Sequence, residues 1–84
     1  MAVKYLLCVI GERASDIPRS RNFAEDLHFS LAEKGLGTTS DPDTMTTELY
    51  VVIPKARKVG QANQLIRDLI AKHMMEHDTE ITRV

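Results

Sequence analysis

The chain is most easily bounded by what it lacks. Its 84 residues include no tryptophan, only four tyrosine and phenylalanine residues together, and a single cysteine, Cys8. One cysteine cannot form an intramolecular disulfide, which favours a reducing, cytoplasmic compartment. The longest apolar run, Tyr5–Ile10, is too short to cross a bilayer, and no basic and then apolar leader precedes the first apolar segment. We therefore expect a cytoplasmic protein with no membrane partner.

The chain also lacks a large charge of either sign. The formal net charge is −1, with 27% charged and 43% hydrophobic residues, which is ordinary for a globular protein. A dedicated nucleic-acid binder is usually basic, and the basic and aromatic motif of RNA-binding sheets is missing, so we expect no nucleic-acid partner. The length predicts a single domain over residues 1–84.

The first half of the chain predicts a strand followed by an amphipathic helix. Val3–Ile10 is almost entirely apolar, which is typical of a central strand buried on both faces. Gly11–Arg19 is polar and indicates a loop, after which Asp16 or Ser20 can cap a helix. Over Ser20–Lys34 the apolar residues fall on one helical stripe, consisting of Phe23, Ala24, Leu27 and Leu31.

The second half predicts a hairpin, a second helix and a short edge strand. The turn signal Asp41–Asp43 separates the weak strand Leu36–Ser40 from the stronger strand Met45–Ile53. After a basic connector, an amphipathic helix extends through Met75 and is ended by His77 and Asp78, and Glu80–Val84 has the polar alternation of an edge strand. The sequence therefore predicts the order strand, helix, strand, strand, helix, strand.

This order is that of the α+β, ferredoxin-like βαββαβ arrangement. Right-handed crossovers would place the first and third strands at the centre of a four-stranded antiparallel sheet in the order 4-1-3-2, with two helices on one face. The hydropathy pattern agrees, because the first and third strands are the most apolar and the second and fourth are the most polar. The fold hosts many unrelated functions and predicts none.

The predicted fold separates the charges along the molecule. One end of the sheet would be basic, with Lys4, Lys34, Lys55, Arg57, Lys58 and Arg83. The other end would be mixed, with the acidic residues Asp41, Asp43, Glu76, Asp78 and Glu80 among arginines and histidines. The small net charge therefore conceals a dipolar molecule.

The basic connector is the least ordinary stretch. Lys55, Arg57 and Lys58 precede a helix start, where a Ser, Thr, Asp or Asn cap is expected and where the helix dipole favours anions. Unpaired backbone N–H groups and the flexible Gly60 would complete a site for a phosphate or carboxylate. The alternative is an ordinary solvated basic loop.

Two histidines raise the question of metal chemistry. His73–His77 matches the HxxEH pattern of inverted zinc peptidases, but such an enzyme needs a third ligand from a following helix, and seven residues remain. We instead expect His73 and His77 to lie on the apolar stripe of the second helix, and we predict no catalytic residue, metal or cofactor. A small enzyme that uses these histidines with the loop Gly11–Arg21 is a further class.

The two central strands suggest the function. Both are apolar on both faces, yet two helices can cover only one face of the sheet. The uncovered residues are predicted to be Tyr5, Leu7, Val9, Tyr50 and Val52, although alternation alone does not say which face of the first strand is open. The sequence therefore predicts a non-enzymatic association domain that pairs with itself or with a protein partner. The alternative is binding of a phosphorylated metabolite or an RNA backbone at the basic connector.

Overall fold

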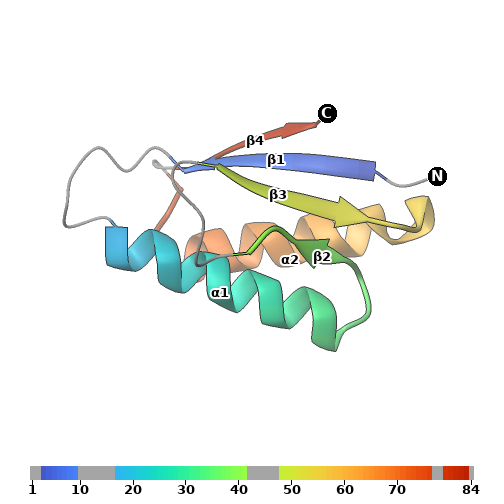
Figure 1. Cartoon of the computed structure of the whole chain (residues 1–84), viewed down its shortest axis with the longest axis horizontal. Helices are drawn as coiled ribbons and strands as arrows, with labels where there is room; N and C mark the ends of the chain where they lie inside the picture. The colour runs from blue at the N-terminus through green and yellow to red at the C-terminus, as the bar shows by residue number, and fades with distance from the viewer. Residues whose placement is uncertain (1–2, 10–16, 42–47, 77–78, 84) are drawn as a thin grey trace.

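A computed structural model describes residues 3–9, 17–41, 48–76 and 79–83 of the chain. The elements confirm the predicted order (Figure 1). They are β1 (Val3–Val9), α1 (Ile17–Glu33), β2 (Thr38–Thr39), β3 (Glu48–Ile53), the 3-10 turn η3 (Ala56–Lys58), α2 (Val59–Lys72) and β4 (Thr79–Arg83).

The strands form one antiparallel sheet in the order β2-β3-β1-β4, which is the predicted order read from the other edge. The two α-helices lie side by side beneath the sheet, and no described element covers its other face (Figure 1). We call the helix side the inner face and the other side the outer face. The α+β, ferredoxin-like fold is therefore confirmed. The tip of the β2–β3 hairpin lies outside the described residues.

The core lies between the inner face and the helices. Alternate residues of β3 are buried, and in β1 Tyr5 and Leu7 lie on the same side. Against them pack the predicted stripe of α1 and the apolar face of α2, so that side chains from every layer meet. The buried helix residues include Phe23, Leu27, Leu31, Ala62, Ile66 and Ile70.

The start of α1 differs from the prediction. The helix begins at Ile17, within the segment predicted to be a loop, and Pro18 occupies its first turn. Proline is tolerated there because a first-turn N–H has no partner inside the helix. Ser20 lies inside the helix and its side chain is buried, so its predicted role as a cap is wrong. Asp16, the other predicted cap, lies outside the described residues.

The two α-helices end in the same way. In α1 the amide of Gly35 donates to Ala32 and that of Leu36 donates to Leu31, and Gly35 has φ of 64°. This is the pattern of a Schellman motif, in which the positive φ is usually supplied by glycine.

At the end of α2 the same motif forms without glycine. The Met74 amide donates to Ala71 and the Met75 amide donates to Ile70, while Met74 itself has φ of 55°. The helix thus ends at Lys72, and the prediction that it continues to Met75 is wrong. Burial of Met75 (0% exposed) against the core favours this termination over another helical turn.

No helix in the described ranges has the length and apolar character needed to span a membrane.

Candidate functional site

The outer face of the sheet is an apolar strip with charged ends. Antiparallel partners have side chains on the same face, so the pairing defines rows across β1 and its neighbours. The central row consists of Thr82, Leu6 and Tyr50. On one side of it Lys4 pairs with Val52, and on the other side Glu48 and Glu80 both pair with Cys8.

The structure corrects two of the predicted interface residues. Tyr5 (7% exposed) and Leu7 (0%) belong to the core on the inner face and are not available to a partner. The outer residue of β1 between them is Leu6, which is half-buried. Both faces of this strand are apolar, so the period-2 pattern of the sequence could not say which one the helices cover. The Val9 side chain lies outside the described part of the structure.

The other two predicted residues do lie on the outer face. Tyr50 is 48% exposed and Val52 is half-buried, although no described element covers the strand there. Leu6 and Tyr50 are direct cross-strand partners, and Val52 is the diagonal neighbour of Leu6, so the three form a contiguous patch. The Tyr50 hydroxyl donates to Glu48 Oε2 at 3.1 Å.

Two backbone amides of the basic connector already have partners within the chain. The 3-10 turn η3 leads directly into α2, and within it the Lys58 amide donates to Lys55 and the Val59 amide donates to Ala56. These two N–H groups are therefore not free for a ligand, and the anion site around Gly60 stays a prediction. No side chain caps either η3 or α2, so the predicted lack of a cap is confirmed.

The cations of this connector are also placed differently from one another. Lys58 Nζ donates to the Gly35 carbonyl at 3.1 Å and so helps to satisfy the end of α1. Lys55 and Arg57 are exposed, and a Cβ added at Gly60 would meet no atom within 4 Å. A shallow hollow of about 360 Å³ beside them is lined by Ala32, Gly35, Leu36, Gly37, Thr38, Pro54, Lys55 and Lys58.

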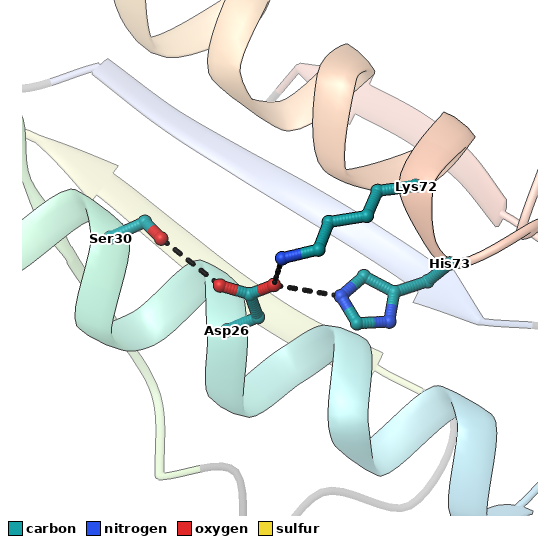
Figure 2. Close-up of polar contacts among 4 residues, drawn as sticks. All are labelled: Asp26, Ser30, Lys72 and His73. Carbon is teal, nitrogen blue, oxygen red and sulfur yellow. Dashed lines mark hydrogen bonds and ion pairs between the residues drawn. The ribbon is translucent and has the colours of Figure 1, made fainter.

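A second polar cluster joins the two α-helices around Asp26 (Figure 2). Asp26 Oδ2 accepts hydrogen bonds from Lys72 Nζ at 2.9 Å and from His73 Nε2 at 2.8 Å. Its other oxygen, Oδ1, accepts from the Ser30 hydroxyl at 3.2 Å. The His73 side chain is only 18% exposed and its ring meets Phe23 edge to face, with centroids 6.0 Å apart.

The chemistry of the cluster follows from the charge on Asp26. Hydrogen bonds from His73 and then Lys72 hold the pKa of Asp26 below its ordinary value of 3.8, against a desolvation that acts in the opposite direction. Since an ionised carboxylate only accepts, His73 Nε2 carries the shared proton. The sequence did not predict this contact because the partners are 47 residues apart and α2 ends earlier than expected.

The arrangement does not support the zinc-peptidase interpretation. His73 is the C-cap of α2 and Met74 leaves the helical conformation, so the described residues of the HxxEH stretch are not on one helix. The His73 side chain nevertheless packs against the core residue Phe23 at the end of the helix, as the predicted stripe requires. His77 lies outside the described residues, and among those described no group of three or more His, Cys, Asp or Glu side chains could hold a metal ion.

His28 makes a separate contact with β2. Its Nδ1 lies 2.8 Å from the Thr39 hydroxyl, which itself donates to the Ser40 carbonyl at 2.9 Å. Because a threonine hydroxyl has one proton, Nδ1 of His28 must be the donor. The contact attaches the short edge strand to α1.

Comparison with protein-family models, with curated proteins and with solved structures finds no match.

Proposed function

We propose that the protein works by association, as a non-enzymatic domain that pairs with a second copy of itself through the outer face of the sheet. The observation that supports this is the patch of Leu6, Tyr50 and Val52 on the two central strands, which no described element covers. Burying such a patch against a like surface removes apolar area from water and gives an aligned sheet sandwich.

The surroundings of the patch fit an interface better than a solvated sheet. Apolar side chains occupy its middle, and polar or charged ones surround them on the strands at either side, such as Thr82 and Glu80 on β4. A hydrophobic centre with a polar rim is the usual anatomy of a protein interface. We therefore place the binding residues at Leu6, Tyr50 and Val52, within a cytoplasmic protein.

The proposal is tested by light scattering coupled to size-exclusion chromatography. The unmodified chain should elute as a dimer and Leu6→Asp as a monomer, because the substitution would bury a charge at the centre of the interface. Phe29→Asp is the matched control, since Phe29 is 67% exposed on α1, on the helix layer. A dimer that persists in Leu6→Asp, or one lost only in Phe29→Asp, would show that another surface is used.

Anion binding at the basic connector is a second candidate. The observation that favours it is the hollow of about 360 Å³ beside Pro54, which is lined in part by Lys55 and Lys58. Inorganic phosphate added in an NMR titration should shift the amides of residues 55–61, and Lys55→Ala should weaken that shift. Shifts that are equal at Lys72, on the far end of α2, would indicate only nonspecific screening.

A further inference from the structure

The charges on the outer face are sorted along the strands. Lys4 lies near the start of β1. Glu48 on β3 and Glu80 on β4 lie on either side of Cys8, which is four residues after Lys4 in β1. All three side chains are exposed. With about 3.3 Å of rise per residue, the positive row and the negative row are about 13 Å apart, on either side of the row that contains Leu6 and Tyr50.

Two symmetric arrangements place this face on a copy of itself with the strands of the two sheets aligned. A two-fold axis that relates two packed faces lies in the plane between them, and aligned strands require it to run either along the strands or across them. An axis along the strands keeps each row over its own copy. Lys4 would then face the second Lys4, and Glu80 would approach Glu48 across the interface, which is repulsive at both ends.

An axis across the strands, over the row of Leu6 and Tyr50, reverses the rows and leaves β1 over β1. Each Lys4 then lies above the position between Glu48 and Glu80 of the second copy. Neighbouring strands are about 4.8 Å apart, so both carboxylates flank the lysine, and extended Lys and Glu side chains together bridge the roughly 10 Å between packed sheets. Leu6 and Tyr50 keep their own counterparts at the centre.

We propose that the outer face pairs with a second copy in this orientation alone, with the two-fold axis across the strands and with Lys4 of each chain between Glu48 and Glu80 of the other. The inference rests on the proposed self-association and adds its geometry. A second copy is the occupant that fits this face. Lys4 lies on one side of the central row and Glu48 and Glu80 lie on the other, so a half-turn brings opposite charges together at both ends.

Charge reversal at the two rows tests the orientation by sedimentation equilibrium. Lys4→Glu alone, and Glu48→Lys with Glu80→Lys, should each raise the dimer dissociation constant on the order of tenfold or more, because each makes both ends of the interface repulsive. An equimolar mixture of the two variants should recover a heterodimer about as tight as the unmodified dimer, since every contact is then again between opposite charges.

Matched controls carry the same charge changes away from the outer face. Lys55→Glu lies in the connector, Glu33→Lys at the last residue of α1 and Glu76→Lys in the turn after α2, and all three side chains are exposed. These variants should dimerise like the unmodified chain.

The outcomes separate the two proposals. An unmodified chain that stays monomeric overturns the self-association and the orientation together. A dimer that Leu6→Asp disrupts but that neither charge reversal weakens leaves the self-association standing and overturns the orientation. Weakening by each reversal with recovery in the mixture supports both.

Discussion

The two faces of the sheet have a similar apolar character in the sequence and different surroundings in the structure. On the inner face, Tyr5, Leu7 and Val51 are at most 7% exposed and belong to the same core cluster as buried residues of both helices. On the outer face, Leu6 and Tyr50 belong to the same two strands and have no covering element among those described. The inner set therefore stabilises the fold, whereas the outer set is available for association.

The largest expected effect contrasts neighbouring leucines of β1. Leu7→Ala should lower the free energy of unfolding by about 2–5 kcal/mol, because it leaves a cavity in a fully buried site. Leu6→Ala should lower that of the monomer by less than about 1 kcal/mol, since the side chain is half-buried. Urea unfolding at a protein concentration below that of dimerisation measures both. Equal losses would mean that the two faces are equally covered in the monomer.

The next effect concerns the attachment of the helices that cover the inner face. Asp26→Asn should lower the free energy of unfolding by about 1–2 kcal/mol near pH 6, because it weakens hydrogen bonds from His73 and Lys72 to a charged acceptor. Asp68→Asn is the control, since Asp68 is exposed and accepts a hydrogen bond from Gln64, one turn earlier in the same helix. Dimerisation should not change in either variant.

The same variant has a defined pH dependence. The pKa of Asp26 is lowered in the folded state, so its contribution to stability is present above its unfolded value of 3.8 and is lost as the pH falls through the folded pKa. The difference between the unmodified chain and Asp26→Asn should therefore be constant from about pH 5 to 6 and shrink below about pH 4. A difference that grows on acidification would contradict the role assigned to Asp26.

A smaller effect distinguishes the ends of the two helices. Gly35→Ala should lower the free energy of unfolding by about 1 kcal/mol, because alanine is strained in the left-handed backbone conformation of this residue. The added Cβ would meet no atom within 4 Å, so no steric clash adds to this loss. Met74→Gly should raise it by about 0.5–1 kcal/mol by removing that strain from the end of α2. Thermal unfolding of both variants checks the signs. Changes of the same sign would show that the two motifs are not equivalent.

The smallest effect on folding is expected at the centre of the outer face. Tyr50→Ser should lower the free energy of unfolding of the monomer by only about 0.5–1 kcal/mol. The loss is small because the side chain is 48% exposed and its hydroxyl contacts the exposed Glu48. The same change should weaken the dimer on the order of tenfold, as expected for a central aromatic residue. A dimer unaffected by Tyr50→Ser would separate the patch from association.

The topology could be predicted because the order and type of the elements follow from local patterns of apolar and polar residues. The predicted strands Val3–Ile10 and Met45–Ile53 contain the two central strands β1 and β3, and the α1 stripe was predicted residue by residue, since period and composition determine these features. The face of β1 could not be predicted in this way. A strand that is apolar at successive positions fits the core in either orientation, and packing against the helices decides between them.

The contacts of the polar residues were also beyond the sequence. The Asp26–His73 pair depends on where α2 ends, and that end depends on a methionine in a conformation usually given to glycine. The predicted anion site depended on free amides, and the 3-10 turn before α2 gives partners to two of them, those of Lys58 and Val59. In both places a single turn of backbone decides what a side chain or an N–H group can reach.

Sedimentation equilibrium of the unmodified chain, from about micromolar to about millimolar concentration, tests the central proposal most directly. Self-association through the outer face predicts a mass that rises with concentration from the 9.5 kDa of the single chain to twice that value and then stays constant. A mass that stays at 9.5 kDa over the whole range would contradict the proposal.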